Sequence, residues 1–171
     1  MRKNSALTLI ELLISVLLIS ILVGAVWVVY NVGSRSFQSQ WTRSGLKSEA
    51  GRALTYMGRG LRIATAVTTS SATTLTFTAD VDGNGSNDIV QYAWSGVSGA
   101  PLNRTLITTV PASTTTDPAI RSVSSLTFTY YDSSNIATTT PSLVRVVSIN
   151  VTVKEGNESF TLRTNFDIRN L

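Results

Sequence analysis

The sequence contains no cysteine and no histidine. Without thiols the chain forms neither disulfides nor thiolate metal sites. Without imidazole it lacks the commonest general base and the commonest transition-metal ligand. Its three lysines, Lys3, Lys47 and Lys154, lie in no recognisable nucleophile motif. We therefore predict that the protein is not an enzyme and has no small-molecule substrate.

Charged residues are also scarce, at 14% of the chain. The formal net charge is +4, but Arg2 and Lys3 precede a long apolar run and are lost if that end is processed. Subtracting these two from the 14 basic residues leaves 12 against 10 acidic ones, dispersed along the sequence. A protein that follows a phosphate backbone clusters its basic residues. Nucleic-acid binding is therefore not indicated.

Polar residues are nearly absent from one stretch, Leu12–Tyr30. Its 19 residues are enough for a helix to cross a hydrocarbon core of about 30 Å. Arg2 and Lys3 in front of it predict a cytoplasmic amino terminus and export of the remainder of the chain. Trp27 and Tyr30, at its far end, suit the aromatic belt of the outer interface. The stretch predicts a single-pass protein of the inner, cytoplasmic membrane.

A single carboxylate, Glu11, stands at the head of this stretch, and two simple interpretations accommodate it. One is a cleaved secretory signal ending near Val23-Gly24-Ala25. The apolar run is longer than the usual 7–15 residues of such signals, however, and it continues through Val26–Val29. The other is a generic single-span anchor that tolerates a charge near the cytoplasmic interface. Neither interpretation gives Glu11 a purpose.

A third interpretation makes Glu11 functional, as ionisable residues within spanning segments usually are. Cleavage between Ala6 and Leu7 would create an α-ammonium four residues from Glu11, on the same helix face. Between staggered neighbouring chains, the ammonium of one would neutralise the Glu11 of another. Because an unpaired carboxylate is costly in lipid, such pairing would select the register between subunits.

The segment "SALTLIELLISV" resembles the prepilin processing and methylation motif of type IV pilins and type II secretion pseudopilins. The resemblance implies that Ala6 ends a leader peptide, that Leu7 is the N-methylated first mature residue, and that Leu7 and Glu11 carry subunit assembly. The family usually has Gly and Phe where this chain has Ala6 and Leu7. The implied partners are the prepilin peptidase, other pilin or pseudopilin subunits and an inner-membrane assembly platform. The resemblance also implies that the protein is incorporated into a filament and that its carboxyl-terminal domain is periplasmic or extracellular.

Beyond Tyr30 the sequence predicts that the helix continues to about Ala64 with an amphipathic face. Apolar residues recur there at three- and four-residue spacing, at Ala50, Ala53, Leu54, Met57 and Leu61. Glycines weaken this helix, and we expect local melting between Asn31 and Gly45. We divide the chain into a leader (1–6), a transmembrane and assembly helix (7–30), its amphipathic continuation (31–64) and a β domain (65–171).

From Thr65 onward the pattern is one of short strands rich in β-branched and aromatic residues. The predicted fold is therefore α+β, with the long amino-terminal helix packed on a carboxyl-terminal antiparallel sheet, as in pilins. Lys154–Asn157 predicts a hairpin turn, and Ser95–Ala119 a long loop with one strand at Arg104–Thr109. The main predicted strands are TTLTFT (Thr73–Thr78), DIVQYAW (Asp88–Trp94), SLTFTYY (Ser125–Tyr131), LVRVVSINVTV (Leu143–Val153) and SFTLRTNFDI (Ser159–Ile168).

The β domain resembles one branch of the family, the J-type minor pseudopilins and PilW-like minor pilins, in "LTFTADVDGNGSNDIVQYAW", "SSLTFTYYDSSN" and the terminal "DIRNL". Minor subunits of this kind sit at or near the filament tip and help to initiate assembly. The competing interpretation is a membrane-tethered binding module, either an adhesin or a DNA-contacting component of a competence filament.

One further motif, "DVDGNGSND", follows the start of an EF-hand-type calcium loop. The residue at position twelve would be Gln91 instead of a bidentate Glu, and no helices flank the loop. A polar hairpin turn, which uses the same residue types, is the simpler interpretation. No cofactor is otherwise expected. If calcium binds, the oxygen ligands come from Asp80, Asp82, Asn84, Ser86 and Asp88.

Overall fold

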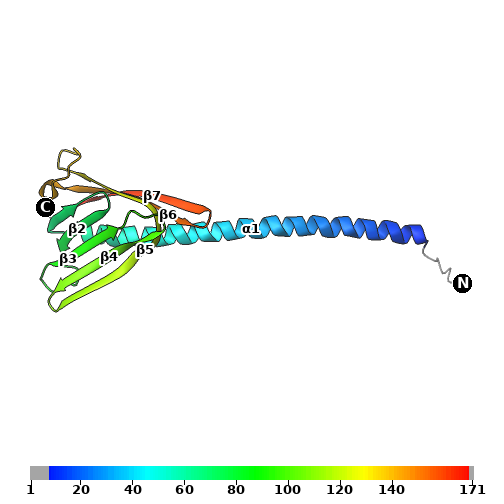
Figure 1. Cartoon of the computed structure of the whole chain (residues 1–171), viewed down its shortest axis with the longest axis horizontal. Coiled ribbons are helices and arrows are strands. Elements are labelled where there is room, and N and C mark those ends of the chain that lie inside the picture. Colours follow the sequence, from blue (N-terminus) through cyan, green and yellow to red (C-terminus); the bar gives the residue numbers. More distant parts are fainter. Residues whose placement is uncertain (1–7, 170–171) are drawn as a thin grey trace. The chain divides into compact units, whose positions relative to one another are not determined.

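The computed structural model describes residues 8–169 and confirms the α+β fold. Helix α1 covers Leu9–Arg62, and seven strands follow it in one sheet (Figure 1). The chain divides into two compact units, Met1–Trp41 and Thr42–Leu171. The elements after α1 are β1 (Ala66–Ser70), β2 (Thr74–Ala79), β3 (Asp88–Trp94), β4 (Ala100–Thr109), β5 (Ala112–Tyr131), the 3-10 helix η1 (Pro141–Leu143), β6 (Val146–Glu155) and β7 (Glu158–Asp167).

The first unit is the apolar half of α1. Its large side chains from Leu9 to Val32 are all exposed in the isolated chain. A helix that is apolar on every side is stable only when protein or lipid surrounds it. Among residues 8–169, α1 is the one helix whose length and composition suffice to cross a membrane. The predicted transmembrane helix is confirmed by its length and composition.

The predicted melting between Asn31 and Gly45 is wrong, because α1 continues without a break through these residues. Asn31 Nδ2 donates to the Trp27 carbonyl at 3.0 Å, and Ser34 Oγ donates to the Asn31 carbonyl at 3.1 Å. These side chains add hydrogen bonds along the helix instead of ending it. The glycines are isolated, and each costs only about 1 kcal/mol in a helix that is already nucleated on both sides.

The sheet of the second unit is an antiparallel meander in which strands β1 to β7 are neighbours in chain order. The β6–β7 pair ends at Glu155 opposite Glu158, with only Gly156 and Asn157 between them. Gly156 adopts a positive φ of 58°, which this tight connection requires and which glycine allows without strain. The hairpin predicted at Lys154–Asn157 is confirmed.

The predicted long loop at Ser95–Ala119 is wrong, but the strand predicted within it at Arg104–Thr109 is confirmed as part of β4. Most of the segment forms β4 and the first part of β5, which pair from Ala100 opposite Val123 to Thr109 opposite Ala112. The prolines do not prevent this arrangement, because Pro111 occupies the turn and Pro118 lies where the register is irregular. Proline is tolerated at turns, strand ends and bulges, where no ladder hydrogen bond is lost.

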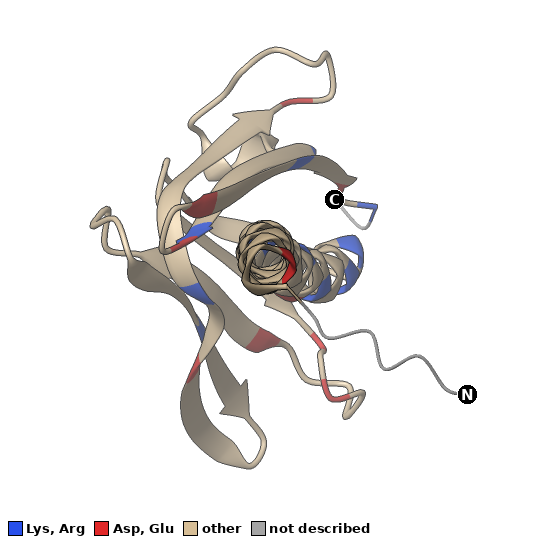
Figure 2. Cartoon of the chain, turned by 90° about the vertical axis from the view of Figure 1, so that its right-hand side faces the viewer, with Lys and Arg blue, Asp and Glu red and all other residues tan. Residues whose placement is uncertain are grey.

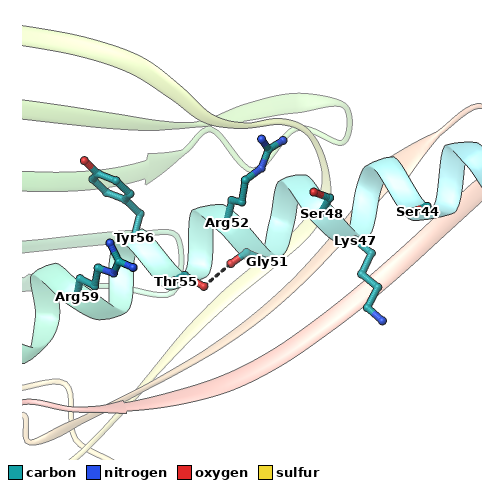
Figure 3. A pocket seen from close by; sticks show the side chains of 8 residues that line it. All are labelled: Ser44, Lys47, Ser48, Gly51, Arg52, Thr55, Tyr56 and Arg59. Carbon is teal, nitrogen blue, oxygen red and sulfur yellow. Dashed lines mark hydrogen bonds between the residues drawn. The ribbon is translucent and has the colours of Figure 1, made fainter.

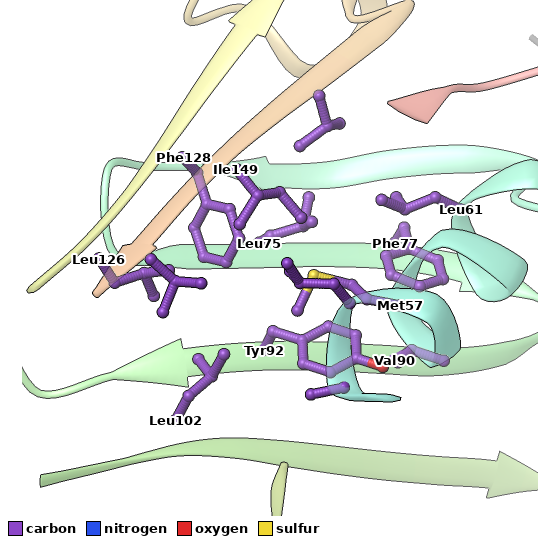
Figure 4. Packing of buried hydrophobic residues seen from close by; sticks show 14 of the residues in the cluster. Met57, Leu61, Leu75, Phe77, Val90, Tyr92, Leu102, Leu126, Phe128 and Ile149 are labelled. Atoms are coloured by element: carbon purple, nitrogen blue, oxygen red, sulfur yellow. The ribbon is translucent and has the colours of Figure 1, made fainter. Parts of the chain in front are cut away.

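The core lies between the carboxyl-terminal part of α1 and one face of the sheet. Met57 and Leu61 are fully buried against Leu75 and Phe77, among other residues of the strands (Figure 4). The predicted apolar stripe of α1 is confirmed as core, since all five of its residues are buried: Ala50, Ala53, Leu54, Met57 and Leu61. Gly58 is also buried, and the ring of Phe166 from β7 lies directly against it.

Candidate functional site

The first turn of α1 is closed by two side chains that bond to each other and to the backbone. Thr8 donates to Glu11 Oε2 twice, from its backbone N at 3.1 Å and from its hydroxyl at 3.0 Å. Glu11 N in turn donates to Thr8 Oγ1 at 3.4 Å. This reciprocal arrangement is a capping box, in which two otherwise unpaired N–H groups find acceptors. This capping role was not predicted, although its signal, Thr-x-x-Glu before an apolar run, is present in the sequence.

The cap uses only one oxygen of the Glu11 carboxylate. Its Oε1 accepts no hydrogen bond from any residue in the described range 8–169. The main chain around it is fully helical, since Leu12 N donates to the Thr8 carbonyl at 3.2 Å and Ser15 Oγ to the Glu11 carbonyl at 2.7 Å. The structure thus holds a carboxylate at a fixed place on the helix with one acceptor oxygen available. Ala6 and Leu7, the predicted cleavage and methylation residues, lie outside the described residues.

Residues 1–27 match the sequence model of the prokaryotic N-terminal methylation motif. The match covers the basic start, the Thr8–Glu11 cap and most of the apolar run. The chain carries a pilin-type methylation motif. No curated protein matches the chain. The motif supports a prepilin-peptidase substrate similar to type IV pilins and pseudopilins. Together with the apolar part of α1, it supports anchoring in the membrane by one helix. It indicates a structural subunit that assembles with other pilins.

The chain has a second polar constellation, in the loop between β2 and β3. Asp80 holds this loop by accepting three backbone hydrogen bonds. Its Oδ1 accepts from Gly83 N at 2.8 Å and Asn84 N at 3.1 Å, and its Oδ2 accepts from Gly85 N at 2.9 Å. These bonds account for Asp80 as a turn residue without any ion.

The carboxylates of Asp80, Asp82 and Asp88 nevertheless converge, with one oxygen of each within 4.8 Å of the others. Asp88 is fully buried, and its carboxylate accepts two long hydrogen bonds, from Val81 N at 3.4 Å and Thr109 N at 3.3 Å. None of the three carboxylates forms an ion pair with a described residue. The site therefore holds a concentration of negative charge that hydrogen bonds only partly compensate.

The remaining predicted calcium ligands are Asn84 and Ser86. The Asn84 side chain is fully engaged, since its Nδ2 donates to Asp82 Oδ2 at 2.8 Å and to the Val110 carbonyl at 2.7 Å. Its Oδ1 accepts from Ser86 N at 2.7 Å. Gln91, at the twelfth position, donates to Thr76 Oγ1 at 3.4 Å in the neighbouring strand. The structure thus brings together the three aspartates and places Gln91 away from them.

Proposed function

We propose that this protein is a minor pilin or pseudopilin subunit of a type IV pilus or a type II secretion filament. It is processed by prepilin peptidase after Ala6, methylated on Leu7 and assembled through its amino-terminal helix. The observation that supports the proposal is Glu11, held by Thr8 at the head of an apolar helix with its Oε1 open to a further donor. That oxygen suits the ammonium of a neighbouring subunit's first residue.

The pairing explains why the charge is retained. In lipid an unpaired carboxylate is disfavoured, and a neighbouring ammonium removes that penalty only when the two subunits are correctly staggered. The cap through Oε2 fixes the side-chain rotamer beforehand, so that little side-chain entropy remains to be lost on pairing. The orientation follows from Arg2 and Lys3, which hold the amino terminus in the cytoplasm and leave the sheet in the periplasm.

The competing function is a membrane-tethered binding module, an adhesin or a DNA-contacting component. Such a module would bind its target in the absence of a filament, whereas an assembly subunit would not. Gel-shift and surface-binding assays on the full chain in detergent separate the two. Binding by the isolated chain would favour the module.

The decisive experiment is mass spectrometry of the mature amino terminus from cells that contain the peptidase. We expect the chain to begin at N-methyl-Leu7 and to be present in the sheared filament fraction. A product that retains Met1, or one trimmed near Ala25 by an ordinary signal peptidase, has no α-ammonium opposite Glu11. Either product would refute the assembly mechanism.

We also propose that the Asp80–Asp88 loop binds calcium weakly, because three carboxylates converge there without a cationic partner among residues 8–169. With so few ligands, the dissociation constant is expected at about 0.1–1 mM, as in extracellular modules. Calorimetric titration of the full chain in detergent should show saturable binding that Asp82→Asn abolishes.

The matched control for this titration is Asp132→Asn. Asp132 is a turn aspartate outside the cluster, whose Oδ1 accepts from Ser134 N at 2.8 Å and Ile136 N at 2.9 Å. This variant should bind calcium like the parent chain. Absence of both heat and a thermal shift in the parent chain would dispose of the calcium site and leave only the turn.

A further inference from the structure

Basic residues that are dispersed in the sequence gather on one element of the second unit. Lys47, Arg52, Arg59 and Arg62 of α1 are exposed, and Figure 2 shows blue segments of this helix on the side that the curved sheet leaves open. Arg52, Tyr56 and Arg59 project from neighbouring turns, whereas Lys47 points in another direction (Figure 3). None of the four basic side chains forms an ion pair with a described residue.

At the end of α1, Arg59 and Arg62 border a cavity of about 410 Å³, which we call the arginine cavity. It lies between the last two turns of α1 and strands β2, β3 and β4. Three arginines line it: Arg59, Arg62 and Arg104. Its other walls are apolar or aromatic, and no Asp or Glu lines it among the described residues. It is thus a cationic recess with an apolar interior.

Arg104 is the half-buried member of this group, whereas Arg59 and Arg62 are exposed. Its guanidinium carbon lies 5.7 Å from the centre of the Tyr56 ring, in cation–π contact. Its Nε is buried and has no hydrogen-bond partner among residues 8–169. Asp117 is directly opposite in the β4–β5 pair but forms no ion pair with it. Burial raises the pKa of the adjacent Tyr92 despite the opposing effect of Arg104, so Tyr92 is neutral and supplies no counter-charge.

We propose that the arginine cavity binds one carboxylate side chain presented by another subunit of the filament. Guanidinium groups bind carboxylates through paired, charge-assisted hydrogen bonds. The aromatic and apolar walls suit the methylene groups of a glutamate, and buried arginine and tyrosine residues dominate binding energy at protein interfaces. The identity of the partner as a filament subunit rests on the proposed function; the carboxylate specificity does not.

A nucleic acid is disfavoured as the occupant by the surroundings of the cavity. Val81 lines it, and the carboxylates of Asp80 and Asp82 flank Val81 in the chain. A polyanion would bring many phosphates close to these carboxylates, and like charges repel. A single carboxylate inserted between the arginines avoids that repulsion. The cavity also lacks the continuous basic track that follows a nucleic-acid backbone.

The test uses the full chain in detergent micelles and a short peptide, acetyl-Gly-Leu-Glu-Leu-Gly-amide, observed by ligand NMR. The peptide with Gln in place of Glu is the comparison. We expect the Glu peptide to bind about tenfold more tightly, because one charge-assisted contact is lost in the Gln peptide. Arg104→Gln and, separately, the more exposed Arg59→Gln should each weaken binding of the Glu peptide about tenfold. The two variants together keep the test valid if one of them fails to fold.

Lys47→Gln is the matched control, because Lys47 lies on the same helix but outside the arginine cavity. It should leave peptide binding unchanged within about twofold. Equal binding of the two peptides, or no effect of either arginine variant, would overturn the proposal. A single-stranded oligonucleotide that binds more tightly than the Glu peptide, and is weakened by the same variants, would overturn the proposal and identify a phosphate backbone as the ligand. Failure of the proposed function shows itself separately, as a chain that retains Met1.

Discussion

Glu11 has two separable tasks at the level of the single residue. Its Oε2 caps the helix through Thr8, and its Oε1 accepts no bond from the described residues. The first task needs only a hydrogen-bond acceptor, which glutamine also provides in a capping box. The second, as we propose it, needs the negative charge. Substitution can therefore distinguish the helix cap from the assembly contact.

We predict that Glu11→Gln keeps the chain in the membrane but sharply reduces its incorporation into filaments, because the cap survives and the charge does not. Glu11→Ala should behave similarly in assembly. Thr8→Ala retains the charge, loses the cap and should reduce incorporation less. Immunoblots of sheared filaments and of membranes measure both quantities. Normal incorporation of Glu11→Gln would reject the charge pairing.

Gly58 offers a second residue-level prediction, together with a matched control on the same helix. A methyl group at Gly58 would lie 2.2 Å from Phe166 Cε1, whereas one at Gly51 would meet nothing within 4 Å. Gly58→Ala should lower the free energy of unfolding by about 1–3 kcal/mol through overpacking. Gly51→Ala should raise it by about 0.5–1 kcal/mol through helix propensity. Unfolding curves followed by circular dichroism measure both, and equal stability of the variants would contradict this packing.

At the scale of elements, prediction succeeded where a pattern is local and failed where it depends on distant partners. Strand β3 has the bounds that DIVQYAW indicates, and the β6–β7 hairpin forms at the predicted turn. Strand β1, rich in Thr and Ser, was not predicted, because its only apolar core residue is Val67. The first parts of β4 and β5 were predicted as loop because their prolines suggested turns. Pairing with a neighbour overrides such local signals.

Tyr130 joins two of these elements. Its hydroxyl donates to the carbonyls of Ser71 and Thr74 at 2.7 and 3.0 Å, and Phe128 N donates to the Ala72 carbonyl at 2.8 Å. These bonds attach the β1–β2 turn to β5. Burial raises the pKa of Tyr130 above its usual value, with the hydrogen bond to Ser71 acting in the opposite direction.

Because its pKa is raised, Tyr130 stays neutral in the folded state at alkaline pH values at which it ionises in the unfolded chain. The stability that Tyr130 contributes is therefore complete below pH about 10 and is lost as the pH rises above it. We predict that Tyr130→Phe lowers stability at pH 7 by about 1 kcal/mol, through the lost hydrogen bonds. The free energy of unfolding of the variant should also fall less steeply between pH 9 and 11 than that of the parent chain. Denaturant unfolding across that range measures both effects, and an unchanged alkaline slope would contradict the role of Tyr130.

At the scale of the whole molecule, the two units differ in what they bury. All the buried apolar residues of the described chain lie between Leu46 and Ile168, within the second unit. The large apolar residues from Leu9 to Val32 are all exposed in the described chain. The second unit therefore contains everything that a folding core requires, and the first depends on lipid or on other subunits.

We predict that a fragment beginning at Thr42 is water-soluble and unfolds at the same temperature as the full chain, within about 3 °C. A fragment beginning at Gly51 removes the buried Leu46 and Ala50 and should unfold several degrees lower. Thermal unfolding followed by circular dichroism compares the two. Aggregation of the longer fragment would show that the core needs the preceding helix.

Function could be predicted from the sequence only where the residues involved are contiguous. The methylation motif is contiguous, so its residues are recognised without knowledge of the fold. The arginine cavity is not, because Arg104 in β4 meets Arg59 and Arg62 of α1 only after the sheet has packed on the helix. Charges that are dispersed in the sequence thus become a cluster in space. Neither the composition nor the spacing of basic residues along the sequence reveals such a cluster.

The chain-order arrangement of the strands bears on how the protein matures. On the outward path that we propose, the amphipathic end of α1 leaves the bilayer first and presents its apolar face as a template. Every later strand then meets a neighbour that has already emerged, since β1 to β7 pair in sequence. Such contacts close short loops and form quickly. The sheet can therefore grow at one edge while export of the chain continues. No exposed edge strand stays unpaired until a distant segment arrives.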